Sequence, residues 1–315
     1  MIRLVDNESA RAIDKIVKSY GLIKKYPTAR MNIPDKTFGF FPPRNITYFI
    51  NQPPKYTIKL FKAQRQNRTE YFRESVAYKI FNIERLHMPK LIAEGKVGGY
   101  YFICRKYVDG DNFRAIYKKL DTKKKYEIFY SFGKMLKYIH GTNESKLQDK
   151  IKHNEDIFKA EEISLVNDQI EQIKNTPFCS FYRRIKAFAD KNLGLLSNSR
   201  IGIVHGDFQD KNIIIKQGKV AGLIDFENLK IGIQEKEVAL GNMCSYTKFS
   251  LKERTSFQDK ILDGYGYNEA DRDEFWTKYN VYCFFNIVGF IASGLTNNNS
   301  VARKRIKREL EYILR

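Results

Sequence analysis

Residues 201–227, IGIVHGDFQDKNIIIKQGKVAGLIDFE, decide how the rest of the chain is interpreted. Three short apolar runs in this stretch are separated by polar segments: 201–204, 213–215 and 220–224. The turn signal Gln217-Gly218 lies between the last two runs. This pattern predicts a strand, a polar loop and then a β-hairpin.

The polar loop and the end of the hairpin carry three side chains suited to phosphoryl transfer. Asp207 and Asn212 lie in the loop, and Asp225 follows the last apolar run. A hydroxyl that attacks the terminal phosphate of ATP needs a carboxylate to orient it and to accept its proton, which fits Asp207. Mg²⁺ prefers hard oxygen ligands, which fits the amide of Asn212 and the carboxylate of Asp225.

The motif HGDFQDKN at 205–212, followed by IDFE at 224–227, resembles the catalytic loop and metal-binding segment of the aminoglycoside phosphotransferase and choline kinase family. The family is the small-molecule branch of the protein-kinase-like fold. Both the residue identities and the two spacings agree, which makes the match specific. The resemblance implies an α+β fold with two lobes. Residues 1–108 are expected to form a small, mostly antiparallel β lobe with one main helix, and 109–315 a larger, mainly helical lobe.

In the first lobe the resemblance assigns two residues to the nucleotide site. Lys59, within the strand-like run YTIKLF, is expected to contact the α- and β-phosphates of ATP. Glu74 lies in a segment with helical spacing of apolar residues that is bounded by Pro89. Family members pair such a glutamate with the phosphate-binding lysine. Lys59 and Glu74 are therefore a candidate ion pair. The simpler alternative for Glu74 is a solvent-facing charge on the helix, since helical glutamates are common.

Two further parts of the expected nucleotide site carry less information. The resemblance places the hinge between the lobes after residue 105, where backbone groups from Lys106 to Val108 would meet adenine. The segment expected to cover the phosphates has only Gly39, and Pro42 and Pro43 follow. Because proline lacks a backbone donor, this segment departs from the glycine-rich turn of the family.

The resemblance also assigns supporting roles in the second lobe. His205 is expected to brace the catalytic loop through hydrogen bonds. Glu237 stands where the family usually has an aspartate, before a helix, and is expected to anchor the same loop. Glu227 is a candidate ligand of a second metal ion or of the acceptor.

Four other polar residues near these motifs are interpreted more simply. His140 ends a helix that is predicted between Asp121 and Gly141, and it is expected to pack or cap rather than catalyse. Asp210 and Lys211 are expected to be surface charges within the loop. Gln209 stands where protein kinases have a lysine that contacts the transferred phosphate, which favours the small-molecule branch.

Charge is the unusual bulk property, because the 315 residues carry a formal net charge of +20. A solvated basic surface and a site for an anionic partner are both compatible with it. The charge argues against a polycationic aminoglycoside as the natural substrate, since the protein as a whole would repel it. A basic helix at 303–308 is a candidate for peripheral contact with an anionic surface.

Other classes of protein are disfavoured. The N-terminal residues lack the apolar core of a signal peptide, and no run of eighteen apolar residues occurs. The four cysteines lack metal-ligand spacing: Cys104, Cys179, Cys244 and Cys283. They are expected to be free core thiols in a cytoplasmic protein. No nucleic-acid-binding module is recognisable, so a nucleic-acid partner is not expected.

The function predicted from these features is transfer of the γ-phosphate of ATP, with Mg²⁺, to a hydroxyl of a small molecule. The acceptor could be an amino alcohol, a sugar or an aminoglycoside-like compound. Two alternatives remain open at this point. One is a protein or glycan kinase, and the other is a non-catalytic nucleotide-binding protein whose basic surface binds anionic partners.

Overall fold

The computed structural model describes residues 7–22, 30–31, 45–50, 53–143, 145, 155–239, 249–294 and 300–314. The chain divides into two compact units. Unit 1 comprises Met1–Asp111, Ile214–Lys216 and Val220–Leu229, and unit 2 comprises Asn112–Ile213, Gln217–Lys219 and Lys230–Arg315. The predicted phosphate-covering segment around Gly39, Pro42 and Pro43 lies outside the described residues.

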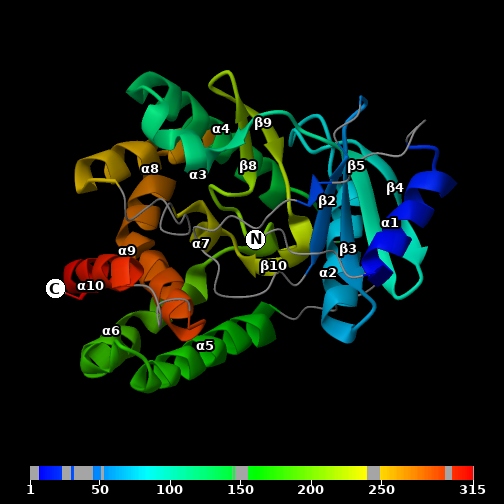
Figure 1. Ribbon diagram of the computed structural model, residues 1–315. Helices are drawn as coiled ribbons and strands as arrows, with labels where there is room; N and C mark the ends of the chain where they lie inside the picture. Colours follow the sequence, from blue (N-terminus) through cyan, green and yellow to red (C-terminus); the bar gives the residue numbers. More distant parts are fainter. Residues whose placement is uncertain are drawn as a thin grey trace. The chain divides into compact units, whose positions relative to one another are not determined.

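Unit 1 is built on a five-stranded sheet with the order β1-β2-β3-β5-β4, in which each neighbouring pair is antiparallel (Figure 1). The strands are β1 (Arg30–Met31), β2 (Ile46–Ile50), β3 (Tyr56–Lys62), β4 (Leu91–Val97) and β5 (Tyr100–Lys106). The described part of this unit also contains the helices α1 (Asn7–Ser19) and α2 (Arg65–Ile80). A mostly antiparallel sheet with one long helix after β3 is the architecture expected for the first lobe.

Alternation along β3 sends successive side chains to opposite faces of this sheet. Ile58 and Leu60 join Ile13 and Ile16 of α1 in a buried apolar cluster. Lys59 therefore points to the other face, where Phe61 of the same strand meets Tyr71 of α2 with ring centroids 5.8 Å apart. The strand period thus delivers Lys59 to the α2 side of the sheet.

Unit 2 is mainly helical, as expected. Its helices are α3 (Phe113–Ile116), α4 (Thr122–His140), α5 (Glu155–Gln172), α6 (Tyr182–Asn192), α7 (Gln234–Val238), α8 (Leu251–Tyr265), α9 (Glu269–Ala292) and α10 (Ser300–Ile313). The predicted boundaries of α4 are confirmed, since Asp121 caps its first turn by accepting from the Lys124 amide at 2.8 Å and Gly141 ends it. A buried aromatic core supports the unit: Phe113, Phe129, Phe132, Phe208, Phe249 and Phe257.

The motif stretch adopts the predicted strand, loop and hairpin. β7 (Ile201–Val204) pairs with β10 (Lys230–Ile233) in an antiparallel two-stranded sheet. β8 (Ile213–Lys216) and β9 (Lys219–Leu223) form the hairpin, and they share a three-stranded sheet with β6 (Asp111–Asn112). A short 3₁₀ turn, η7 (Phe226–Asn228), follows the hairpin.

Three of the cysteines lie in the described part of the chain, and all three are free thiols. Cys104 and Cys283 are buried, as predicted. Cys179 is exposed, so its assignment to the core was wrong. The reason is local, because Cys179 begins a short 3₁₀ turn of which no residue is buried. None of the described helices has the length and apolar character to cross a membrane.

Candidate active site

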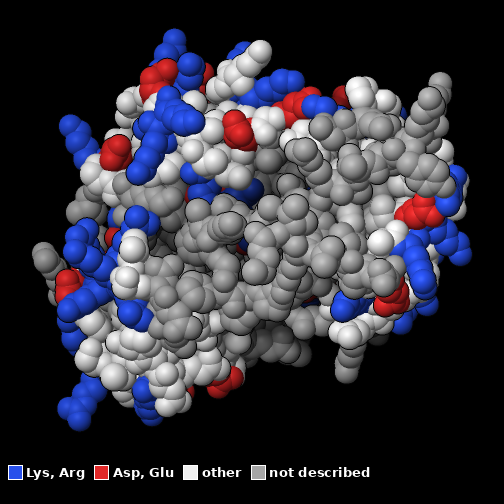
Figure 2. Space-filling model, viewed as in Figure 1, with Lys and Arg blue, Asp and Glu red and all other residues white. Residues whose placement is uncertain are grey.

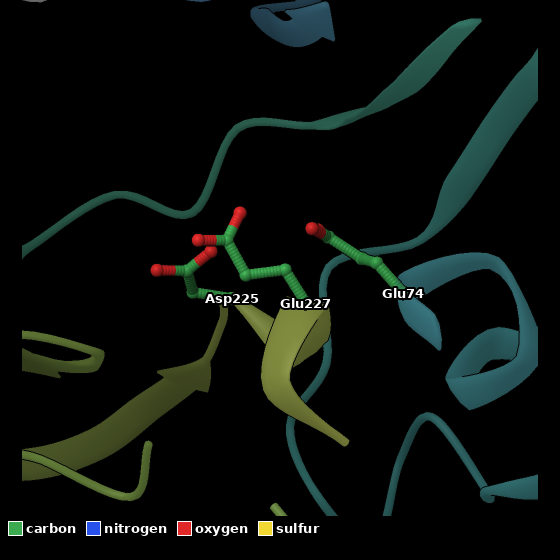
Figure 3. Close-up of side chains that lie close together, drawn as sticks. All are labelled: Glu74, Asp225 and Glu227. Carbon is green, nitrogen blue, oxygen red and sulfur yellow. The ribbon is translucent and has the colours of Figure 1, made fainter. Parts of the chain in front are cut away.

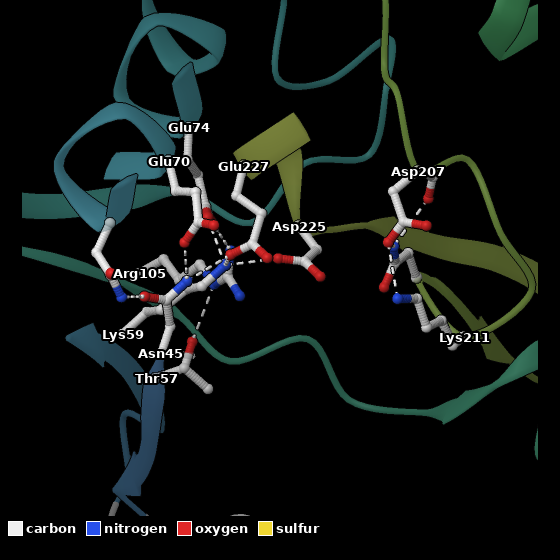
Figure 4. Close-up of polar contacts among 12 residues, drawn as sticks. Asn45, Thr57, Lys59, Glu70, Glu74, Arg105, Asp207, Lys211, Asp225 and Glu227 are labelled. Carbon is white, nitrogen blue, oxygen red and sulfur yellow. Dashed lines mark hydrogen bonds and ion pairs between the residues drawn. The ribbon is translucent and has the colours of Figure 1, made fainter. Parts of the chain in front are cut away.

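Lys59 is the centre of a buried ionic cluster in unit 1 (Figure 4). Its Nζ lies 2.8 Å from Oε2 of Glu74, 2.5 Å from Oδ1 of Asp225 and 2.6 Å from Oε2 of Glu227. The side chains of Lys59 and Glu74 are 6% and 0% exposed. Burial opposes the charge of Lys59, but the three carboxylates outweigh it and raise its pKa well above 10.5. The ion pair predicted between Lys59 and Glu74 is present.

The same three carboxylates could hold a divalent cation. Glu74, Asp225 and Glu227 each offer an oxygen within 4.8 Å of those of the other two, and Figure 3 shows the three side chains converging. Hard oxygens at this separation suit Mg²⁺. Because the Lys59 ammonium already contacts all three carboxylates, it provides the positive charge that such an ion would otherwise supply.

Asp225 owes its position to an unusual backbone conformation. It has φ 73° and ψ 58°, in the left-handed region that few residues other than glycine adopt. Aspartate tolerates this region better than most, and here it turns the chain from β9 into η7. Both Asp225 and Glu227 are thereby presented toward Lys59 (Figure 4). An outlier of this kind at a charged cluster is typical of functional sites.

Arg105 is a second buried cation in the cluster, and no local pattern in the sequence indicates it. Its Nη1 donates to Oε1 of Glu74 at 2.6 Å, and its Nε donates to Oγ1 of Thr57 at 3.3 Å. Burial opposes the charge of Arg105, but the Tyr78 hydroxyl and the Glu74 carboxylate outweigh it and raise its pKa. Arg105 is the direct cross-strand partner of Thr57, two positions before Lys59. The pairing of β3 with β5 is therefore what indicates that Arg105 lies beside Lys59 and Glu74, and this pairing is known only from the fold.

Asn45 is another contributor that the sequence did not indicate. Its Nδ2 lies 2.8 Å from Oε2 of Glu227 and 2.9 Å from Oε2 of Glu70, which is buried on α2. Glu227 therefore shares one oxygen between Lys59 and Asn45. Burial raises the pKa of Glu227, while the charge of Lys59 acts in the opposite direction. In this arrangement Glu227 orients Lys59, in addition to being a candidate metal ligand.

The expected hinge lies at the end of β5. The amide of Lys106 donates to the Lys90 carbonyl at 2.9 Å, and the amide of Tyr107 donates to the Lys55 carbonyl at 3.0 Å. Among the described residues, no hydrogen bond uses the amide of Val108. The side chain of Val108 packs directly on Gly222 of β9, where a Cβ would lie 2.8 Å from Cγ1 of the valine.

The catalytic-loop residues form a second group, within unit 2. Nδ2 of Asn212 donates to Oδ2 and to the main-chain oxygen of Asp207, both at 2.9 Å. These bonds fix the two side chains against each other and engage the amide nitrogen of Asn212, which leaves Oδ1 as the atom of this amide that could ligate a metal. Phe208 anchors the loop, since it is 1% exposed and packs on Phe132 of α4.

Of the two loop residues predicted to be surface charges, Asp210 is buried and Lys211 is exposed. Asp210 is fully buried, and its Oδ1 accepts from Nε and Nη2 of Arg114 at 3.1 and 2.8 Å. It is not a surface charge, because the loop turns inward at this position and α3 supplies a cation. Lys211 is 42% exposed, as predicted for a surface charge, and its Nζ lies 2.7 Å from Oδ2 of Asp207.

Glu237 connects the loop to the helices around it. Its carboxylate accepts from the amides of His205 and Gly206 at 3.0 and 2.7 Å, and Nε2 of His140 lies 3.1 Å from it. Burial would raise the pKa of Glu237, but these hydrogen bonds and the nearby histidines outweigh it and lower the pKa. Nδ1 of His205 accepts from the Asp207 amide at 3.3 Å. His140 also contacts the Tyr265 hydroxyl at 2.9 Å, in agreement with its predicted packing role.

Comparison with families of known proteins identifies the family of this chain. The model of the phosphotransferase enzyme family aligns with residues 44–276, which is well over half of the chain. The aligned region includes both groups of site residues. A search of the curated proteins found no match.

Solved structures of aminoglycoside phosphotransferases share the fold. The GDP complex of aminoglycoside 2'-phosphotransferase-IIIa superposes with a TM-score of 0.69 at 13% identity, covering 98% of this chain and 99% of that one. The streptomycin-ATP-APH(2")-IIa ternary complex gives 0.62 at 19% identity, with 98% and 97% covered. A complex of APH(4)-Ia with ADP and hygromycin B gives 0.67 at 9% identity, with 96% and 97% covered. The predicted two-lobed kinase-like fold is confirmed.

Proposed function

Because this chain belongs to the phosphotransferase enzyme family, we propose that it transfers the γ-phosphate of ATP to a hydroxyl group of a small molecule, with Mg²⁺ as cofactor. The observation that supports this most is the buried contact of Lys59 with Glu74, Asp225 and Glu227. A buried lysine among three carboxylates is the arrangement needed to position phosphates and a metal ion together. Solved structures of this fold in complex with ATP, GDP or ADP support nucleotide binding.

In this proposal the residues of unit 1 bind the nucleotide. Lys59 contacts the phosphates, and Glu74, held in turn by Arg105, orients Lys59. Backbone groups of Lys106 and Val108 meet the base, which is consistent with the unused amide of Val108 in the described chain. Asp225 and Asn212 would hold Mg²⁺, and Glu227 is a further candidate. When bound, the ion would neutralise charge on the phosphate oxygens.

The residues of the catalytic loop act on the acceptor. Asp207 orients the acceptor hydroxyl and takes its proton as the oxygen attacks phosphorus. Asn212 holds the Asp207 carboxylate in place through its 2.9 Å hydrogen bond. Glu237 and His205 fix the main chain of the loop. These second contacts do not touch substrate and serve to keep Asp207 in position.

The acceptor belongs to the class of amino alcohols, sugars and aminoglycoside-like compounds. Streptomycin, gentamicin and hygromycin B in the neighbouring structures support a hydroxyl-rich acceptor. The net charge of +20 opposes a polycationic one. Figure 2 shows Lys and Arg side chains spread over the face in view, with fewer Asp and Glu among them. Use of ATP and the free thiols support a cytoplasmic location.

The experiment that tests the proposal measures transfer of labelled γ-phosphate from ATP and Mg²⁺ into a size-fractionated cell extract. The wild-type protein is compared with Asp207→Asn, which keeps the size of the side chain and removes its basicity. Label that enters the small-metabolite fraction only with the wild type supports the proposal and supplies a product to identify. Label in macromolecules would instead establish a protein or glycan kinase. Bound ATP without any transfer would establish a non-catalytic nucleotide-binding protein.

A further inference from the structure

Lys211 makes a direct ion pair with the proposed catalytic carboxylate. Its Nζ lies 2.7 Å from Oδ2 of Asp207, and the same oxygen accepts the hydrogen bond from Asn212 at 2.9 Å (Figure 4). Lys211 is the only lysine or arginine in the loop 205–212. The loop therefore brings one cation, one carboxylate and one amide to a single point.

The loop is built so that Lys211 must project at this point. On one side of it, Asp210 is buried and held by Arg114, whose own amide donates to the Asp210 carbonyl at 3.1 Å. On the other side, the Asn212 amide donates to the Gln209 carbonyl at 2.9 Å and closes a tight turn. Because both neighbours are fixed, the backbone at Lys211 has little freedom, and its side chain is presented toward Asp207.

Stability does not explain the pair. The Lys211 side chain is 42% exposed and that of Asp207 is 12% exposed. Ion pairs with a partner this open to water contribute little to folding, because solvent screens the charges and ordering a lysine costs entropy. A lysine that gains little stability in this position, yet is presented by a buried and hydrogen-bonded loop, is better explained by the chemistry of the site.

The reaction needs a cation here. As the acceptor oxygen forms its bond to the γ-phosphorus, the bond from phosphorus to the β,γ-bridging oxygen breaks and ADP leaves with the electron pair. The acceptor proton passes to Asp207. Negative charge on the transferred group must be neutralised during this step. An ammonium bonded to Asp207 lies next to the attacking hydroxyl, and so within reach of the phosphoryl group that this hydroxyl attacks.

We propose that Lys211 is a catalytic residue that contacts the transferred phosphoryl group and neutralises its charge, remaining protonated throughout. The inference rests on the proposed phosphotransferase function. Gln209 stands where protein kinases have a lysine that contacts the transferred phosphate, and its side chain is neutral. In this proposal Lys211, two positions later, supplies that positive charge instead. In the free protein Lys211 is held on Asp207, and it moves to the phosphoryl oxygens when substrates bind.

Three variants test the proposal: Lys211→Met, Lys211→Arg and the control Lys219→Met, which removes an exposed lysine of β9. We expect Lys211→Met to lower kcat by roughly 10²-fold, the usual effect of losing one transition-state donor, with KM for ATP changed less than about twofold. Lys211→Arg should recover most of the rate, and Lys219→Met should match the wild type. A second readout is calorimetric binding of MgADP with and without aluminium fluoride, which mimics the transferred group.

The binding readout separates catalysis from folding. We expect Lys211→Met to bind MgADP normally and to lose the added affinity that aluminium fluoride gives the wild type. The proposal is overturned if Lys211→Met keeps kcat near that of the wild type, or if it loses MgADP affinity and thermal stability together, which would indicate a structural role. A wild-type protein that transfers no phosphate would instead overturn the proposed function, and this inference with it.

Discussion

Lys59 and Asp225 are 166 positions apart in the chain, and the Nζ of one lies 2.5 Å from Oδ1 of the other. The contact depends on two local features. The strand period turns Lys59 toward α2, and the left-handed backbone at Asp225 turns its carboxylate back toward β3. Lys59 therefore serves as a counter-ion of this carboxylate.

Two substitutions of Asp225 distinguish the contribution of its negative charge from that of its left-handed backbone conformation. We expect Asp225→Asn to keep the fold, because asparagine tolerates the left-handed conformation, and to lose Mg²⁺-dependent turnover by several kcal/mol of transition-state stabilisation. Asp225→Ala should lose turnover equally and in addition cost about 1–2 kcal/mol of stability from the strained backbone. Steady-state kinetics against Mg²⁺ concentration and urea unfolding measure the two effects. Near-normal turnover in either variant would contradict the assignment.

Much of this arrangement could be predicted from the sequence because it rests on local patterns. The apolar run at 56–61 predicts a strand, and the spacing of Asp207 and Asn212 predicts the catalytic loop. Their direct contact at 2.9 Å follows from that spacing, since a tight turn closes between them. Local patterns alone do not predict the ion pair between Lys59 and Glu74. That prediction depended on the resemblance to a family whose members have this pair.

The contributors that the sequence missed depend on long-range pairing. Arg105 meets Glu74 only because β3 and β5 align Thr57 with Arg105, and nothing near Arg105 in the sequence indicates a partner. Asn45 reaches Glu227 across 182 positions. Asp210 resembles an exposed loop residue, and its burial requires Arg114 from α3. In each case the information lies in a register or a docking contact between distant segments.

Glu237 should make stability depend on pH. Its pKa is lowered in the folded protein, so it contributes stability that is complete above the ordinary value of 4.5 and is lost as the pH falls through the lower folded value. We expect Glu237→Gln to lose about 1–3 kcal/mol at neutral pH, since two loop amides lose a charged acceptor. The difference from the wild type should shrink as the pH falls from 4.5 toward the lower folded pKa, where the glutamate of the folded protein itself becomes neutral.

Urea unfolding from pH 3 to pH 7 measures this effect. Glu269→Gln is the matched control, because Glu269 is exposed in the first turn of α9. Its unfolding free energy should follow the wild type across the range. A Glu237→Gln protein whose deficit stays constant with pH would show that the loss comes from packing rather than from charge.

Gly133 and Gly264 allow α4 and α8 to pack in backbone contact. A Cβ on Gly133 would lie 2.0 Å from the Ile261 carbonyl oxygen, and one on Gly264 would lie 1.9 Å from the Tyr130 carbonyl oxygen. We expect either alanine substitution to force the helices apart and to cost about 1–3 kcal/mol or more. Gly194→Ala is the control, since nothing lies within 4 Å of its Cβ. Thermal unfolding measures the loss, and unchanged stability in both α4 and α8 variants would refute this packing.

A buried ion pair between Arg254 and Glu309 attaches the basic helix α10 to α8. The contact is bidentate, since Nη1 and Nη2 of Arg254 each donate to one carboxylate oxygen, and both side chains are less than 10% exposed. Breaking a buried pair leaves one charge without its partner. We therefore expect Arg254→Met or Glu309→Leu alone to cost about 3–5 kcal/mol.

The double variant tests whether the ion pair between Arg254 and Glu309 contributes to the stability of α10 as a coupled unit. Replacing both residues removes both desolvation costs, so Arg254→Met with Glu309→Leu should recover most of the stability lost by either single change. Ile306, Leu310 and Ile313 remain buried on the same helix and can hold it in place. Urea unfolding of the four proteins gives the coupling free energy. If the double variant were as unstable as the sum of the single ones, the two residues would not act as a pair, and α10 would depend on its apolar face alone.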